Sequence, residues 1–107
     1  MTPILLDYPD CFVIQLHGPL NASNTIDFQR RVTTAVAQAE HNIVLVDLEQ
    51  VESLDSAGLM ALVQGLKLAQ ALKRRFCLCS VSPSIRIIFE LTQLDRVFEI
   101  FESVTDH

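Results

Sequence analysis

Apolar residues along the chain follow two spacings, one typical of strands and one typical of helices. Short and nearly continuous apolar runs predict strands at residues 4–6, 11–16, 42–48, 76–81 and 97–102. Between them, apolar side chains three and four residues apart predict amphipathic helices at residues 22–39, at residues 56–74 and from Ser82-Pro83 onward. The first two strands flank the turn-prone Tyr8-Pro9-Asp10, which predicts a hairpin. The expected order is therefore β-β-α-β-α-β-α-β.

This order predicts an α/β fold in which one mixed β-sheet has helices packed against it. Helices that join consecutive strands normally form right-handed crossovers within a single sheet. The run at 42–48 is β-branched and apolar on both faces, as expected of a central strand that is covered on both sides. A length of 107 residues with 50% hydrophobic content fits one compact domain, which we place at residues 1–107.

Acidic residues outnumber basic ones by 13 to 8, and the formal net charge is −5. Such a surface repels phosphate backbones and anionic lipid headgroups, so we expect no direct nucleic-acid partner. No apolar run approaches the roughly 18 residues that a membrane-spanning helix needs, and the first residues lack the pattern of a signal peptide. The sequence therefore predicts a cytoplasmic protein without membrane insertion.

The residue types that usually bind metals and cofactors are not arranged for it. Cys77 and Cys79 are two residues apart on a predicted strand, where a bridge between them would be strained, so we predict free thiols that act as small buried apolar residues. No histidine lies near them in the sequence. The glycines, Gly18, Gly58 and Gly65, form no phosphate-binding loop. We predict no metal, no cofactor and no enzymatic activity.

Candidate chemistry gathers where an acidic loop enters the second predicted helix, at Asp55-Ser56. Loops that follow a parallel strand are common places for functional sites. A helix needs one N-cap and the chain supplies two suitable residues in succession, which leaves a hydroxyl available. Gly58 in the first turn costs a helix about 1 kcal/mol and indicates that something approaches the backbone closely, such as a partner surface or a kinase active site.

Four segments together suggest a family. They are Gly18-Pro19-Leu20-Asn21 before the first helix, the strand Ile43–Leu48, the motif Leu54-Asp55-Ser56-Ala57-Gly58-Leu59, and Ser82-Pro83 at the start of the third helix. With these segments, essentially the whole chain resembles the STAS domain family, in particular the free-standing anti-sigma factor antagonists of bacteria. The third segment is similar to the D-S-[SAT]-G phosphorylation motif of that family.

The resemblance implies that Ser56 is a phosphoacceptor and that the partners are proteins. In the family, the unmodified antagonist binds an anti-sigma factor that is also a serine kinase using ATP. Phosphorylation blocks this binding, and a phosphatase restores it. The expected partner contacts are Asp55, Ala57, Gly58 and Leu59, together with Asn21, Ser23 and Asn24 if the loop before the first helix lies at the same edge of the sheet.

Three other interpretations stay open at this point. A receiver-like domain phosphorylated on Asp47 would explain an aspartate at the end of an apolar strand, although no acidic pair for Mg²⁺ follows the first strands. A hydrolase with Ser56 as its nucleophile lacks a recognisable base. A STAS subunit of a transporter or of a stress-sensing complex would share the fold without being phosphorylated.

Overall fold

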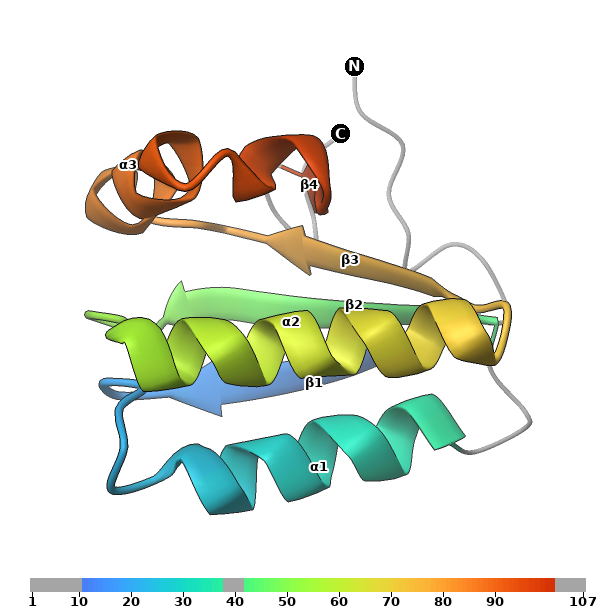
Figure 1. The fold of residues 1–107 in the computed structure, drawn as a ribbon. Coiled ribbons are helices and arrows are strands. Elements are labelled where there is room, and N and C mark those ends of the chain that lie inside the picture. Colours follow the sequence, from blue (N-terminus) through green and yellow to red (C-terminus); the bar gives the residue numbers. More distant parts are fainter. Residues whose placement is uncertain (1–10, 38–41, 102–107) are drawn as a thin grey trace.

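The computed structural model describes residues 11–37 and 42–101. Its elements follow the predicted alternation of strands and helices (Figure 1). The strands are β1 (Cys11–His17), β2 (Ile43–Gln50), β3 (Arg75–Cys79) and β4 (Glu99–Phe101), and the helices are α1 (Thr25–Ala37), α2 (Ser56–Ala71), α3 (Pro83–Leu91) and the short 3-10 helix η2 (Leu94–Arg96). The predicted first strand, Ile4–Leu6, and with it the hairpin, lies outside the described residues.

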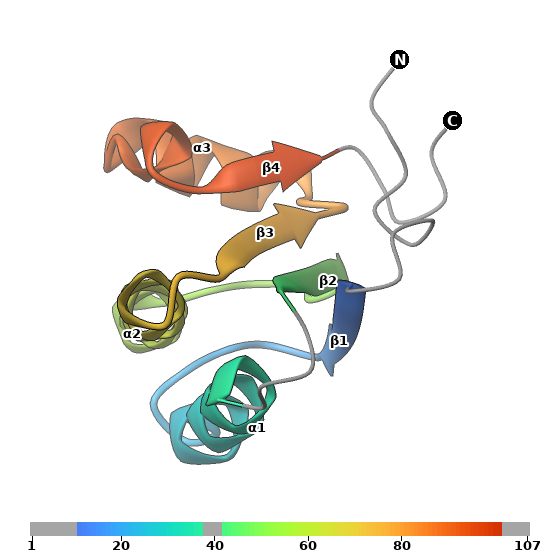
Figure 2. The ribbon, with the colours of Figure 1, turned by 90° about the vertical axis from the view of Figure 1, so that its right-hand side faces the viewer.

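The described strands form a four-stranded parallel sheet in the order β1-β2-β3-β4. Each strand is the neighbour of the one before it, so crossovers of one hand that all step in the same direction leave their helices on the same face. Figure 2 shows α1, α2 and α3 together on one side of the sheet. The α/β class and the order of these elements are confirmed. We predicted a mixed sheet because the hairpin would add an antiparallel strand at residues 4–6. Those residues lie outside the described part of the chain, so this part of the prediction stays a prediction.

The sheet carries a main core on its helical face and a smaller cluster on the other face. Val44, Val46 and Leu48 of β2 point into the main core, where they belong to one cluster with residues of all three helices, among them Phe28, Val32, Leu62, Ile85 and Phe89. The alternate residues Ile43 and Leu45 join Cys77 and Cys79 on the opposite face. Because β2 is buried from Ile43 to Leu48, the prediction of a strand covered on both sides is confirmed.

Several elements are shorter than predicted, and left-handed residues mark where three of them end. Lys73 (φ 60°) follows α2, Ser80 (φ 58°) follows β3, and Gln93 (φ 63°) follows α3. Backbone in this region is incompatible with the helix or strand that precedes it. Helix α2 therefore stops at Ala71 rather than 74, and β3 stops at Cys79 rather than 81. The helix η2 was not predicted.

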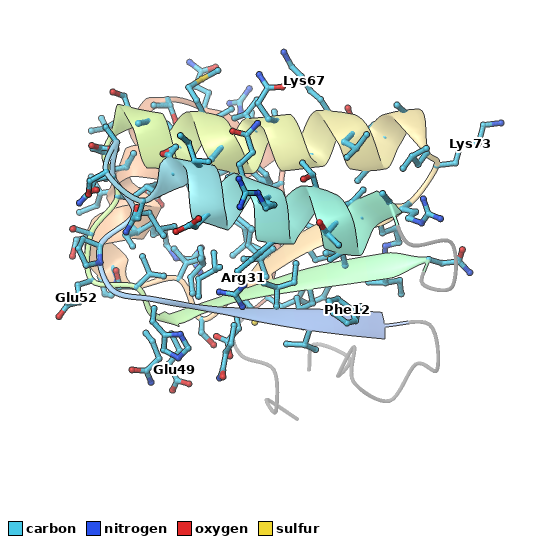
Figure 3. All side chains as sticks on the ribbon, turned by 90° about the horizontal axis from the view of Figure 1, so that it is seen from below. Phe12, Arg31, Glu49, Glu52, Lys67 and Lys73 are labelled. Atoms are coloured by element: carbon cyan, nitrogen blue, oxygen red, sulfur yellow. The ribbon has the colours of Figure 1, made fainter. Side chains whose placement is uncertain are left out.

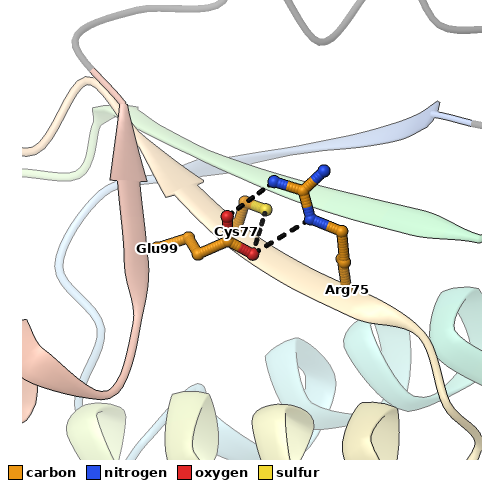
Figure 4. A network of polar contacts seen from close by, with 3 residues as sticks. All are labelled: Arg75, Cys77 and Glu99. Carbon is orange, nitrogen blue, oxygen red and sulfur yellow. Dashed lines mark hydrogen bonds and ion pairs between the residues drawn. The ribbon is translucent and has the colours of Figure 1, made fainter.

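The short strand β4 is tied to β3 by a polar network at its first residue (Figure 4). The guanidinium of Arg75 donates to both carboxylate oxygens of Glu99, from Nε at 3.0 Å and from Nη2 at 2.6 Å. The thiol of Cys77 donates to Glu99 Oε1 at 3.7 Å. The hydrogen bonds from Arg75 lower the pKa of Glu99, and partial burial opposes that shift. Cys77 and Cys79 are buried and are not in a disulfide, as predicted.

Candidate functional site

Asp55 and Ser56 have different structural roles at the start of α2. Asp55 is the N-cap, with extended backbone, and its Oδ1 accepts a hydrogen bond from the amide of Gly58 at 3.0 Å. Ser56 is the first residue of the helix and is exposed. Within the part of the chain that the structure describes, its hydroxyl has no hydrogen-bond partner. The expectation that one residue caps the helix and leaves a hydroxyl available therefore agrees with the geometry.

The loop before α1 is joined to the loop before α2 by a single parallel bridge between Leu20 and Leu54. The amide of Leu20 donates to Ser53 O at 2.9 Å, and the amide of Asp55 donates to Leu20 O at 3.1 Å. Leu20 and Leu54 are both buried. These bonds continue the parallel pairing of β1 and β2 beyond the strands, and they hold the two loops together at the carboxyl edge of the sheet.

Gly58 lies against this bridge. A Cβ atom at Gly58 would stand 2.6 Å from the backbone oxygen of Leu20 and 2.9 Å from its Cβ. The close approach expected from the sequence thus exists, but the group that approaches is the chain's own Leu20, and Gly58 is buried. Its local role is to let the two loops meet.

The turn Asn21–Asn24 follows Leu20 directly and therefore lies beside the start of α2. Its polar side chains hold its shape: Asn21 Oδ1 accepts from the amide of Ser23 at 2.9 Å, and Asn24 Oδ1 accepts from the amide of Asn21 at 2.9 Å. Asn24 also donates to Pro19 O through Nδ2. Ser23 is exposed, whereas Asn21 and Asn24 are half-buried. Because this turn occupies residues 21–24, α1 begins at Thr25 instead of residue 22.

We call the accessible residues of this edge the Ser56 surface; they are Asp55, Ser56, Ala57 and Met60 of the α2 end and the turn Asn21–Asn24. Leu59 is half-buried and packs against the main core, so it contributes only in part. Met60 is 50% exposed, one helical turn after Ser56, and was missed by the sequence reasoning. The signal in the sequence that could have identified Met60 is its position four residues after Ser56, on the same helical face.

Charges are distributed unevenly around this surface. Glu49 is exposed near the end of β2, and Glu52 is exposed in the loop that follows it. Asp55 is a third exposed carboxylate. Figure 3 shows Glu49 and Glu52 at one end of the molecule, whereas Lys73 stands at the other end and Lys67 points outward from α2. Asp55 is therefore the one charged residue of the Ser56 surface, with Glu52 near it in the sequence and Glu49 on the side of the sheet away from α2, and cations lie towards the carboxyl end of α2.

Asp47 does not have the surroundings of a phosphoacceptor. Its side chain is 4% exposed, and its oxygens accept from Gln15 Nε2 at 3.3 Å and from the amide of Glu49 at 3.0 Å. Among the described residues, no group of three or more His, Cys, Asp or Glu side chains could hold a metal ion. These contacts fit a strand-end aspartate that accepts amide hydrogen bonds and disfavour the receiver-like interpretation.

No described helix is both long and apolar enough to cross a membrane.

The fold agrees with that of known proteins. The STAS domain family model matches residues 2–107, so the chain belongs to the STAS domain family. A protein from Thermotoga neapolitana, whose name describes it as a candidate anti-sigma factor antagonist, is 27% identical to this chain over 97 residues. The aligned residues cover 91% of this chain and 86% of that protein. A crystal structure of such a candidate antagonist from Thermotoga maritima has a TM-score of 0.83 at 26% identity, covering 91% of this chain and 83% of its own.

The fold is also that of the anti-sigma factor antagonist SpoIIAA, a Bacillus cell fate determinant. The unphosphorylated form of SpoIIAA has a TM-score of 0.68 at 19% identity and covers 96% of this chain and 84% of its own. The phosphorylated form has a TM-score of 0.66 at 22% identity and covers 86% of this chain and 83% of its own. At these identities the likeness concerns the fold.

The cap at Asp55 gives a first prediction. Asp55→Ala should lower the free energy of unfolding by about 1 kcal/mol, because the amide of Gly58 then loses its side-chain acceptor. Asp55→Asn is the matched control, since an asparagine oxygen can accept the same bond, and it should cost only a few tenths of a kcal/mol. Urea unfolding of the three proteins measures both differences. Equal losses in the two variants would contradict a role for Asp55 as the cap.

Proposed function

We propose that this chain is an anti-sigma factor antagonist that is switched by phosphorylation of Ser56. In its unmodified form it binds an anti-sigma factor that is also a serine kinase, the phosphorylated form releases that partner, and a phosphatase restores binding. The observation that carries the proposal is the exposed Ser56 hydroxyl, which stays available because Asp55 caps the helix. Membership of the STAS family and relatives named as antagonists support it.

The phosphorylation step needs only an accessible hydroxyl and a kinase with ATP. The Ser56 oxygen attacks the γ-phosphorus, a new O–P bond forms, the bond to the leaving ADP breaks, and the hydroxyl proton passes to a base of the kinase. The protein itself is the substrate and supplies no catalytic group. Removal by the phosphatase is hydrolysis of the same O–P bond, with water as the second reactant.

The position of Ser56 allows the phosphorylated chain to remain folded. The first amides of a helix have no partner within the helix, and the positive end of the helix dipole favours an anion there. Helix α2 extends over 16 residues from Ser56, so it presents a full dipole. A phosphoryl group at this point adds about −1.5 to −2 charges and three acceptor oxygens without displacing any described contact of Ser56.

The cost of phosphorylation falls on the complex instead. Asp55 already gives the Ser56 surface a negative charge, and exposed Glu52 lies three residues before it. A partner that fits this surface must remove water from the phosphoryl dianion when it binds, and an unpaired ion is expensive to desolvate. The switch therefore acts at the contact itself and requires no rearrangement of the sheet.

Phosphotransfer from the cognate kinase tests the proposal. Incubation with the purified anti-sigma factor kinase and ATP should add one phosphoryl group to the native chain by intact-mass analysis and none to Ser56→Ala. Ser53→Ala is the matched control, because Ser53 is also exposed, three residues earlier, and only its backbone oxygen is engaged; it should be labelled like the native chain. Labelling of Ser56→Ala would show that the acceptor is another residue. Binding without any labelling would favour a STAS interaction subunit of a transporter or stress-sensing complex.

A further inference from the structure

Two large apolar side chains are exposed close to the Ser56 surface or within it, one on each of the neighbouring helices α1 and α2. Ile26, in the first turn of α1, is 71% exposed, and Met60 of α2 is 50% exposed. Single exposed apolar residues are common on protein surfaces, whereas a contiguous apolar patch marks a contact with another molecule. The question is therefore whether these two side chains lie together.

The packing of α1 on α2 places the two residues at the same level. A Cβ atom at Gly65 of α2 would stand 2.6 Å from Val32 Cγ1 of α1, so these two positions lie side by side. Both helices start at the carboxyl edge of the sheet and run in the same direction (Figure 1). Ile26 lies six residues before Val32, and Met60 lies five before Gly65. With the rise of a helix, the two residues differ in level by only about 1.5 Å.

Ile26 points away from the sheet. Each residue of a helix is turned by about 100° from the one before it. Ile26 is thereby turned by about 120° from Val32, which faces α2, and by about 140° from Arg31, which donates to the backbone oxygen of Gln15 in β1. The side of α1 that faces β1 is thus a different side from the one that carries Ile26.

Met60 points away from the sheet as well. It is turned by about 140° from Gly65, which faces Val32 of α1 and Phe76 of β3, and by about 40° from the exposed Ser56. Packed helices lie about 8–10 Å apart, a distance over which two long side chains on the same outer face can be covered by one group of a partner. We call these two residues the Ile26–Met60 patch.

The two helices that carry the patch are basic, although the formal net charge of the chain is −5. Over their described lengths, their charged residues are Arg30, Arg31 and Lys67 against Asp27. Arg30 follows Ile26 by four residues and Lys67 follows Met60 by seven, which places each cation on the helical face of the apolar residue before it. Lys67 points outward from α2 (Figure 3). Within residues 11–37 and 42–101, neither Arg30 nor Lys67 is in an ion pair.

We propose that the Ile26–Met60 patch receives an apolar side chain of the anti-sigma factor kinase, and that Arg30 and Lys67 pair with carboxylates of the same partner. The proposed function supplies the identity of this partner. The patch adjoins the phosphoacceptor through Met60, one helical turn after Ser56, so one partner surface covers both. An apolar group followed by carboxylates is the chemistry that complements an apolar patch followed by cations.

This contact gives the phosphoryl group its effect on binding. A partner that covers Met60 excludes water from the neighbourhood of Ser56, and the dianion then loses hydration without gaining a compensating charge. Ile26 lies outside the segment that contains Ser56 and its cap, and its exposed side chain supports no core contact. It can therefore determine which kinase binds without changing the residue that is phosphorylated.

Calorimetric titration with the purified anti-sigma factor kinase tests the patch, without ATP so that Ser56 stays unmodified. Ile26→Ser should weaken binding about tenfold, because it removes an apolar anchor from the contact. Ile87→Ser is the matched control, since Ile87 is 54% exposed on α3, on the other side of α2 from α1 (Figure 1). This control should change the affinity less than about twofold. Met60→Gln keeps the length of the side chain and should weaken binding by about as much as Ile26→Ser.

A charge reversal tests the second half of the contact. Lys67→Glu should weaken binding about fivefold at low ionic strength and less as salt is added. Lys73→Glu makes the same change in net charge at the far end of the molecule, after α2, and should stay within about twofold. Equal losses in Lys67→Glu and Lys73→Glu would show that only the net charge matters and would refute the pairing.

The methyl signal of Met60 reports the contact in the native chain, so the test does not depend on how the variants fold. It should shift when the kinase is added, whereas the methyl signals of Ile87 should not. If the kinase phosphorylates Ser56 but neither Ile26→Ser nor Met60→Gln weakens binding, the patch is overturned and the proposed function stands. A kinase that neither binds nor phosphorylates the native chain would overturn both. Equal losses in Ile26→Ser and Ile87→Ser would also refute the patch.

Discussion

Gly58→Ala is expected to lower the free energy of unfolding by about 2 kcal/mol, although alanine is the better helix former. The change removes a helix penalty of about 1 kcal/mol. It also places a Cβ atom 2.6 Å from the backbone oxygen of Leu20. Leu20 cannot easily withdraw, because its amide and its oxygen are bonded to Ser53 and Asp55. Overpacking typically costs about 1–3 kcal/mol, and a contact this short with fixed backbone atoms lies at the upper end of that range. The propensity gain then leaves a net loss of about 2 kcal/mol.

Thermal and urea unfolding measure this effect. Gln64→Ala, at an exposed position of the same helix, is the control and should stay within about 0.5 kcal/mol of the native chain. Gly58→Ala should also slow phosphorylation of Ser56 by the cognate kinase, since the turn Asn21–Asn24 is attached through Leu20. A Gly58→Ala protein as stable as the native chain would show that the contact with Leu20 relaxes without cost.

Ser56→Asp is expected to weaken binding of the anti-sigma factor kinase by roughly a hundredfold, which corresponds to about 3 kcal/mol. The carboxylate reproduces part of the phosphoryl charge within the Ser56 surface, which Asp55 already makes negative, and binding would have to desolvate it. Ser56→Asn is the matched control, because it has nearly the same shape without the charge. It should bind within a few-fold of Ser56→Ala. Titration by calorimetry at fixed salt measures all three.

Stability separates this effect from misfolding. An acidic residue in the first turn of a helix is favourable by about 0.3–1 kcal/mol, so Ser56→Asp should unfold no more easily than the native chain while it binds less tightly. Weak binding by both Ser56→Asp and Ser56→Asn would indicate that the shape of the serine matters and its charge does not. Unchanged binding by Ser56→Asp would contradict a switch at this residue.

The elements that could be predicted from the sequence are those whose signal is local. The run Ile43–Leu48 is apolar on both faces and became the buried strand β2. Ser82-Pro83 is a cap followed by a proline at the first helical position, and α3 begins there with Ser82 accepting from the amide of Ile85. The start of α2 at Ser56 was equally readable, because Asp55 is a strong N-cap residue.

The features that were missed either depend on a contact between distant segments or leave no distinct local signal in the sequence. Gly58 signalled a close approach, but only the fold shows that Leu20, 38 positions earlier in the sequence, is what approaches. The ends of α2, β3 and α3 are formed by left-handed Lys73, Ser80 and Gln93. A left-handed position is normally predicted where a glycine occurs, and none of these three residues is glycine. The predicted ends of α2 and β3 therefore lie too far along the chain, and no end was predicted for α3. Met60 was passed over because an apolar helix residue is usually assigned to the core.

The bridge at Leu20 fixes the position of the turn without fixing the residues that form it. The turn Asn21–Asn24 is fastened beside Ser56 through backbone bonds of Leu20, which depend on no particular side chain in the turn. The residues of this turn can therefore differ while Asp55, Ser56 and the bridge keep their arrangement. Under the switch proposed above, such differences would alter which partner binds and leave the chemistry at Ser56 unchanged.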